Sequence, residues 1–137
     1  MSDKITTDKA PKPVGSYPHA RRAGNLLFLS GIGPREAGTN NIPGNVYSKK
    51  GKLKKYDIEA QCHSVFKNVR TVLEASGSSW EKLIDVTVFL TNMKEDFNTY
   101  NKIYAEYFKE NQPCRTTIEI KSLPTQIAIE LKCIAEI

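Results

Sequence analysis

The chain has 137 residues, 39% of them hydrophobic, which is enough to bury one core of ordinary size. It contains no apolar run of the roughly 18 residues that a membrane-spanning helix needs, and its polar start, MSDKITTDKAPKP, lacks the apolar region of a secretory signal. Twenty basic and 15 acidic residues give a net charge of +5, and three widely spaced cysteines favour neither a disulfide framework nor a metal site. We therefore expect one soluble, cytoplasmic domain over residues 1–137.

The first predicted element is a buried strand, because Leu26–Leu29 is apolar and stops at Ser30 and Gly31. Segment 33–56 is rich in Gly, Asn, Pro and Lys, and we expect it to be an irregular insertion. Within it, SKKGKLKK carries five lysines, which indicate a solvated loop or, alternatively, a patch that attracts anions.

A helix follows in YDIEAQCHSVFKNVRTVLEASG, where apolar residues recur at helical spacing between Asp57 as the expected N-cap and Gly77 as the stop. LIDVTVFL, residues 83–90, predicts a strand rich in β-branched residues. DFNTYNKIYAEYF, residues 96–108, places aromatic side chains along one face of a second helix, which ends before Pro113. Two strands, 116–120 and 127–137, close the chain.

This order predicts an α+β fold in which a mixed sheet carries both helices on one face. In the last strand Ile129 and Leu131 alternate with Glu130 and Lys132, so the two pairs point to opposite faces of the sheet. The helices cover only one of these faces. We expect a second copy of the chain to cover the other.

Two charged residues of the closing strands, which we expect to be neighbours, are candidates for chemistry. Glu130 is either exposed, paired with Lys132, or a partly buried acid whose pKa is raised toward the range of proton transfer. Arg115, just after Pro113, is either a surface residue or a rigid fork for a substrate carboxylate.

Other catalytic patterns are missing from the sequence. The two histidines, His19 and His63, are interpreted as structural or surface residues, and neither a Ser-His-Asp arrangement nor a phosphate-binding loop is evident. The net charge would suit a nucleic-acid-binding protein or ribonuclease, but only Tyr47 and Tyr56 flank the lysines, and no histidine pair is placed for RNA cleavage. We therefore do not expect a nucleic-acid partner.

Several segments, spread over nearly the whole chain, are specific in their order and spacing: APKPVGSYPHA, NLLFLSGIGP, DIEAQ, DFNTYNKIYAEYF, PCRTTIEIKSLP and IAIELKCIAEI. Together they resemble the Rid (YjgF) family of small enamine/imine deaminases. YPHARRAGNLLFLSG, LTNMKEDFNTYN and the insertion 33–56 look most like the 2-aminomuconate deaminase branch. The resemblance implies a chorismate-mutase-like domain that assembles as a homotrimer with its sites between subunits.

The resemblance also implies roles for particular residues. Arg115 would grip the substrate carboxylate, and Glu130 would position or activate the attacking water. The remaining substrate-binding positions fall on Tyr17, Ser30, Gly31 and Phe89. The asparagine of the family's D-M-N-D-F run is not carried over, because NMKEDF is one residue longer here, and Thr117 stands where many members have a cysteine.

These roles imply hydrolysis of the C=N bond of a small carboxylate-bearing enamine or imine, which needs neither cofactor nor metal. The expected substrate is 2-aminomuconate, whose second carboxylate would meet Arg35, the lysines, or backbone N–H groups near Gly31. Three alternatives stay open: a general deaminase of the 2-aminoacrylate type, an RNA-binding protein that inhibits translation, and a non-catalytic ligand-sensing trimer. The last would keep the Arg115 pocket but tolerate substitution of Glu130.

Overall fold

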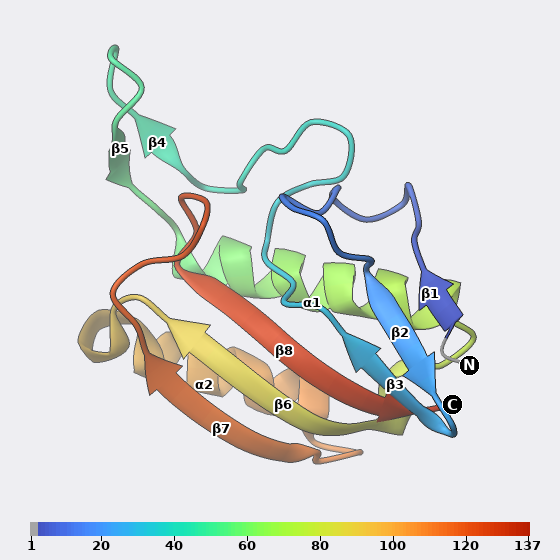
Figure 1. Ribbon diagram of the computed structural model, residues 1–137. Coiled ribbons are helices and arrows are strands. Elements are labelled where there is room, and N and C mark those ends of the chain that lie inside the picture. The colour runs from blue at the N-terminus through green and yellow to red at the C-terminus, as the bar shows by residue number, and fades with distance from the viewer. Residues whose placement is uncertain (1–2) are drawn as a thin grey trace.

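The computed structural model describes residues 3–137, which form a six-stranded sheet with both helices on one face (Figure 1). The strand order is β1-β2-β3-β8-β6-β7, and only the β6–β7 pair is parallel. The elements are β1 (Asp3–Ile5), β2 (Ala20–Ala23), β3 (Leu26–Leu29), α1 (Ile58–Ala75), β6 (Leu83–Leu90), α2 (Met93–Phe108), β7 (Cys114–Glu119) and β8 (Ile129–Glu136). The predicted α+β fold is confirmed. No helix in this part of the chain is long and apolar enough to cross a membrane.

Helix α1 begins and ends where the sequence indicates. The Asp57 carboxylate accepts a hydrogen bond from the Ala60 N–H at 3.1 Å, which makes Asp57 the N-cap. Gly77 adopts a φ of 80° directly after the helix, and the Ser78 N–H donates to the Leu73 carbonyl at 2.9 Å. This arrangement is a Schellman motif, which requires the left-handed residue that glycine supplies.

Helix α2 begins at Met93, three residues before the predicted start at residue 96. The cause is Asn92, whose side chain accepts a hydrogen bond from the Glu95 N–H at 3.1 Å and caps the helix. The aromatic face predicted for this helix packs on the core, where Tyr100, Tyr104 and Phe108 are buried and Phe97 and Tyr107 are partly buried. Its Phe108 ring stacks on Tyr104 at 4.2 Å and on Trp80 at 4.5 Å between ring centroids.

The hydrophobic core lies between the helices and the covered face of the sheet. In β8 the side chains of Ile129, Leu131 and Cys133 are fully buried there, while Glu130 and Lys132 alternate onto the other face and stay partly exposed. The alternation predicted for this strand is therefore confirmed.

The second face of the sheet carries no helix (Figure 1). Large apolar side chains remain accessible on it, with Phe28 at 37% and Ile118 at 41% exposure. Exposing such side chains is costly for an isolated domain. The second copy of the chain expected over this face stays a prediction.

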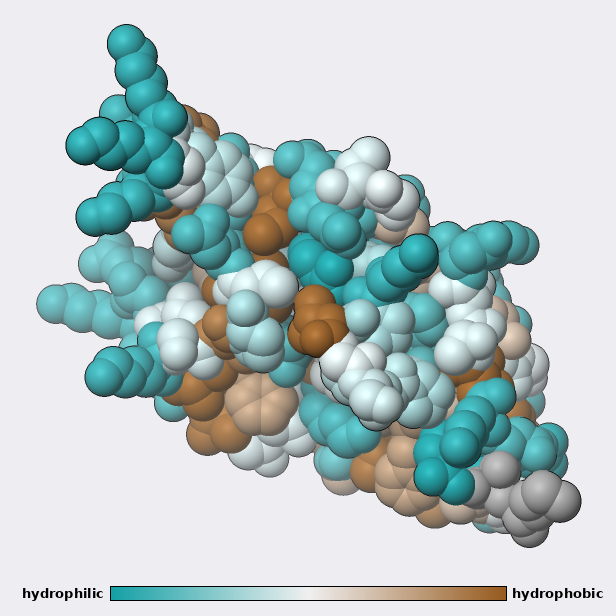
Figure 2. Space-filling view, turned by 45° about the horizontal axis from the view of Figure 1, so that its top comes forward, coloured by the Kyte–Doolittle hydropathy of each residue, from teal (hydrophilic) through white to brown (hydrophobic). Residues whose placement is uncertain are grey.

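Segment 33–56 is irregular over most of its length, as the sequence predicts, but it also contains a short element that the sequence does not predict. It contains an antiparallel hairpin of β4 (Val46–Tyr47) and β5 (Leu53–Lys55), which projects from the body of the protein (Figure 1). The Ser48 N–H donates to the Lys52 carbonyl at 2.7 Å and closes the turn. All five lysines of SKKGKLKK are exposed, and long hydrophilic side chains project at this end of the molecule (Figure 2). We call residues 46–55 the lysine hairpin.

Candidate active site

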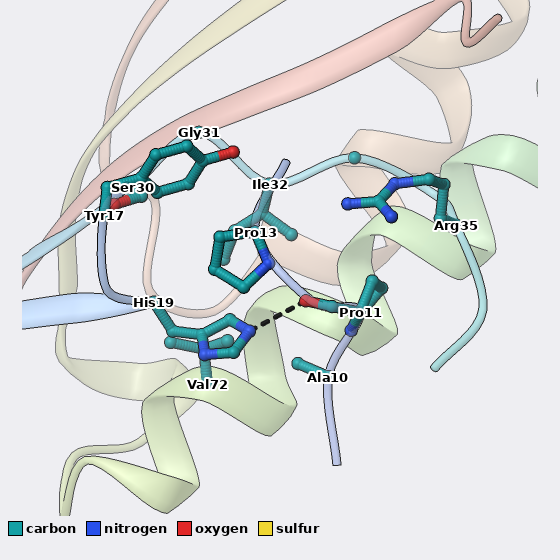
Figure 3. Close-up of a pocket in the computed structure, with 11 residues that line it drawn as sticks. Ala10, Pro11, Pro13, Tyr17, His19, Ser30, Gly31, Ile32, Arg35 and Val72 are labelled. Atoms are coloured by element: carbon teal, nitrogen blue, oxygen red, sulfur yellow. Dashed lines mark hydrogen bonds between the residues drawn. The ribbon is translucent and has the colours of Figure 1, made fainter. Parts of the chain in front are cut away.

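Three of the predicted substrate-binding residues, Tyr17, Ser30 and Gly31, line one pocket (Figure 3). The pocket lies between the segment that leads into β2 and the segment that follows β3, and Arg35 forms its far wall. Its volume of about 40 Å³ is more than the roughly 10–15 Å³ needed to hold one water molecule. One chain therefore offers a small pocket between these two segments.

Ser30 and His19 fix the wall of this pocket through their own hydrogen bonds. The Ser30 hydroxyl donates to the Pro18 carbonyl at 2.7 Å, so only its lone pairs are left for a ligand. The His19 Nδ1 accepts from the Thr7 N–H at 3.2 Å, and Nε2 donates to the Pro11 carbonyl at 2.8 Å (Figure 3). Both ring nitrogens are engaged by backbone groups, which confirms that His19 is structural.

Gly31 packs directly against the carboxylate of Glu130. A β-carbon on Gly31 would lie 2.7 Å from Oε2 and 3.0 Å from Cδ of Glu130, closer than real contacts of this kind. Only glycine permits this approach. Within residues 3–137, the Gly31 N–H has no hydrogen-bond partner, so a free donor lies next to the carboxylate.

Glu130 is a partly buried acid. Burial raises the pKa of its carboxyl group above the ordinary value. The interpretation that it pairs with Lys132 is wrong, because the Lys132 ammonium group donates to the Leu29 carbonyl instead. Exposure at a sheet edge is also excluded, since β8 lies between β3 and β6.

Phe89 lies beside Glu130 on the face of the sheet without helices. The two residues are directly paired across β6 and β8, a position in which β-carbons approach to about 5 Å. Ile118 follows on the other side of Phe89 in β7. An apolar wall therefore adjoins the carboxylate and contributes to its desolvation.

Arg115 occupies a different place. Its Nη1 donates to the Asn101 side-chain oxygen at 2.8 Å, and its guanidinium carbon lies 4.7 Å from the centroid of the Tyr104 ring. Both partners belong to α2, so Arg115 points to the helix-covered side of the sheet while Glu130 points to the other.

The expectation that the strands of Arg115 and Glu130 are neighbours is wrong, because β6 separates β7 from β8. Arg115 is in register with Val86, and Val86 with Cys133, three residues from Glu130. Two strand spacings across and three residues along place the α-carbons of Arg115 and Glu130 about 14 Å apart. Arg115 is nevertheless exposed on an edge strand, where its guanidinium is open to another molecule.

One chain thus joins Tyr17, Ser30 and Gly31 in one pocket, with Glu130 and Phe89 behind Gly31, and leaves Arg115 apart. Within residues 3–137, no group of three His, Cys, Asp or Glu side chains could hold a metal ion.

Sequence reasoning missed two residues that support the pocket. Ser64 and Asn68 lie four residues apart on α1 and donate to backbone carbonyls of segment 33–35. The sequence feature that could have identified them is their spacing: two polar side chains four residues apart lie on one side of a helix, here next to its apolar stripe.

The chain is similar in sequence and structure to several known proteins. The family described as Endoribonuclease L-PSP matches residues 7–137. A RutC family protein of Pyrococcus horikoshii is 41% identical over 135 residues, 98% of each chain. The Arabidopsis thaliana protein named Reactive Intermediate Deaminase A, chloroplastic, is 37% identical over 131 residues, 96% of this chain and 64% of that one. A crystal structure of E. coli TdcF with bound serine has a TM-score of 0.84 at 29% identity and covers 98% of both chains.

Proposed function

The chain belongs to the Endoribonuclease L-PSP family, the Rid (YjgF) family that its sequence resembles, and we propose that it hydrolyses enamines or imines of small carboxylic acids. The products are the corresponding keto or enol acid and ammonia. The observation that carries this proposal is the half-buried carboxylate of Glu130 against Gly31, with a free backbone N–H and the Phe89 ring beside it.

The reaction follows from these groups. The enamine takes a proton on carbon and becomes an imine, whose carbon is electrophilic without further activation. Glu130 accepts a proton from a water molecule as the water oxygen adds to that carbon, and passes the proton to the nitrogen, which gives a carbinolamine with one hydroxyl and one amino group. Glu130 then takes the hydroxyl proton and passes it to the amino group, so that the C–N bond breaks, ammonia leaves and the C=O bond forms. A general base of this kind contributes on the order of 10²–10⁴-fold, and a raised pKa suits it to both transfers.

Arg115 anchors the substrate carboxylate, and it does so for a site completed by a neighbouring copy of the chain. Asn101 and the Tyr104 ring hold its guanidinium at the edge of the sheet, on the opposite face from Glu130 of the same chain. A homotrimer whose subunits cover each other's exposed sheet faces would bring Arg115 of one copy to Glu130 of the next. The serine bound to TdcF is itself a small carboxylate-bearing molecule, which supports a ligand of this class.

Within this class of substrates we assign 2-aminomuconate, a dicarboxylate. The long insertion 33–56, which brings the cationic side chain of Arg35 to the pocket of Tyr17 and Gly31, supports a substrate with more than one negative charge. We propose that the reaction takes place in the cytoplasm, and the three unpaired cysteines support a reducing compartment of this kind.

The lysine hairpin favours a second candidate function, RNA binding. The structure pairs Tyr47 with Leu53, so an exposed aromatic ring lies on the same ribbon as the lysines, as in proteins that bind single strands. This candidate function is RNA binding alone. RNA affinity that falls steeply with salt, and is lost when the lysines are replaced by glutamine, would support it.

The deaminase proposal is tested by ammonia release from freshly generated enamines, with 2-aminomuconate and 2-aminoacrylate as substrates. We expect the wild-type protein to release ammonia and Arg115→Ala to lose this activity while keeping its oligomeric state. Lys102→Ala, on the same helix as Asn101 but without a role in the site, is the matched control. A wild-type protein that releases ammonia from neither substrate, or an Arg115→Ala variant with normal turnover, would contradict the proposal.

A further inference from the structure

We propose that Arg35 forms a second anion subsite, which binds the distal carboxylate of a dicarboxylate substrate; this inference rests on the proposed deaminase function. The sequence leaves three candidates for this contact: Arg35, the lysines, and backbone N–H groups near Gly31. The structure favours Arg35, because its side chain alone combines a full positive charge with a fixed position in the pocket of Tyr17 and Gly31 (Figure 3).

The guanidinium of Arg35 is oriented but not neutralised. Its Nη1 donates to the Asn40 side-chain oxygen and its Nη2 to the Lys12 carbonyl, each at 2.8 Å. Both acceptors are uncharged. A guanidinium has five N–H donors, so three remain free for a ligand, and a carboxylate can take two of them side by side.

The turn that supplies Asn40 is built to reach the guanidinium. Asn40 has a φ of 60°, an uncommon conformation for a residue other than glycine, and its N–H donates to the Glu36 carbonyl at 3.0 Å. The Glu36 N–H in turn donates to the Asn41 carbonyl at 2.8 Å. These bonds close residues 36–41 into a compact loop that presents the Asn40 side chain to Arg35.

The backbone of Arg35 is held from the opposite side by α1. The Asn68 side chain donates to the carbonyls of Gly33 at 2.9 Å and Arg35 at 2.7 Å, and the Ser64 hydroxyl donates to the Pro34 carbonyl at 2.7 Å. Asn68 is only 6% exposed, so these bonds are sheltered from water. Three consecutive carbonyls are therefore fixed by two helix side chains, which gives Arg35 the rigid support that a specific anion site needs.

The position of Arg35 fits one end of a substrate whose other end reacts at Glu130. In the pocket, the guanidinium and the Tyr17 ring lie on opposite sides (Figure 3). Gly31 borders this pocket and also contacts the Glu130 carboxylate. The volume of about 40 Å³ leaves room for a small polar group beside the guanidinium. A ligand held at Arg35 therefore extends past Gly31 toward the reacting centre.

The other two candidates lack this support. The lysines lie on a hairpin that projects into solvent, and their ammonium groups have no fixed partner in the described residues that would hold them over the pocket. The Gly31 N–H is close enough but uncharged, so it does not distinguish a dicarboxylate from a monocarboxylate by charge.

The test compares Arg35→Gln with the wild-type protein on 2-aminomuconate and on 2-aminoacrylate. We expect the ratio of kcat/KM values, dicarboxylate over monocarboxylate, to fall about 30-fold, as the loss of a hydrogen-bonded charge predicts. The lower ratio should result from a higher KM for the dicarboxylate. Arg35→Lys keeps the positive charge but lacks the planar guanidinium that binds a carboxylate through two N–H groups, so its ratio should lie between those of Arg35→Gln and the wild-type protein. Lys54→Gln, which removes one positive charge from the lysine hairpin, is the control and should leave the ratio unchanged.

A binding measurement separates this inference from the proposed reaction. By calorimetry, the unreactive dicarboxylate muconate should bind the wild-type protein about 30-fold more tightly than it binds Arg35→Gln, whether or not turnover is observed. Equal muconate affinity in the two proteins, or a loss of activity that is the same for both substrates, would overturn the subsite. Selective loss of muconate binding in a protein that releases no ammonia would keep the subsite and refute the deaminase proposal.

Discussion

Replacing Gly31 by alanine is expected to slow ammonia release about 10–100-fold while leaving the fold intact. The added methyl group would lie 2.7 Å from Oε2 of Glu130, so the carboxylate must retreat by about 0.7 Å to reach the 3.4 Å of an ordinary contact. A misplacement of about 1 Å in a reacting group can cost 10²-fold in rate. The obstacle is the end of a flexible side chain, and the φ of Gly31 lies outside the left-handed region. The free energy of unfolding should therefore change by less than about 1 kcal/mol.

The assay is the initial rate of ammonia release, with unfolding in urea as the measure of stability. With 2-aminoacrylate as substrate, which has no distal carboxylate for Arg35 to bind, Gly33→Ala is a matched control, since its methyl group would lie 2.8 Å from the Ile127 side chain and would not contact the Glu130 carboxylate. We expect Gly33→Ala to retain most of the wild-type rate. Normal turnover in Gly31→Ala would refute the reasoning, because the position of the Glu130 carboxylate would then not matter to the reaction.

Two further predictions concern stability. Burial raises the pKa of Glu130 in the folded protein, so the folded state binds this proton more tightly than the unfolded state, and wild-type stability falls as pH rises through the raised pKa. Glu130→Gln should therefore have a higher Tm than the wild-type protein at pH 7, with the difference shrinking toward pH 4; a Tm below wild type at pH 7 would contradict this. Asn68→Ala leaves the carbonyls of Gly33 and Arg35 without their donor and should cost about 2 kcal/mol in urea unfolding, whereas Asn111→Ala, which frees one carbonyl, should cost less.

The parts of the fold that the sequence predicts best are those with one strong local pattern. Helix α1 combines an apolar stripe, a capping aspartate and a glycine stop, and all three lie where the structure has them. The alternation of β8 identified Glu130 as the polar residue on the second face. The lysine hairpin was missed because its strands are two and three residues long, too short for a period-two pattern.

The sequence of β7 could not predict on which face of the sheet Arg115 lies, because the apolar side chain of this strand is on the face without helices. Ile118 suggests that its own side of β7 is the buried one, yet this side lacks helices, and Ile118 is 41% exposed. Thr117, on the side of Arg115, instead meets the Tyr100 hydroxyl of α2 at 2.8 Å. A strand that is apolar on its uncovered side is what an interface between copies would produce, and such an interface leaves no local signal in the sequence.

The central claim, that Arg115 and Glu130 of different copies form one site, is tested most directly by mixing two inactive variants. Arg115→Ala and Glu130→Gln chains are unfolded together in equal amounts, refolded, and assayed for ammonia release. If each site takes Arg115 from one chain and Glu130 from the next, roughly one quarter of the sites in randomly mixed rings carry both residues. We predict recovery of about a quarter of the wild-type activity. A refolded mixture that forms the wild-type oligomer, exchanges subunits and stays inactive would contradict the shared site.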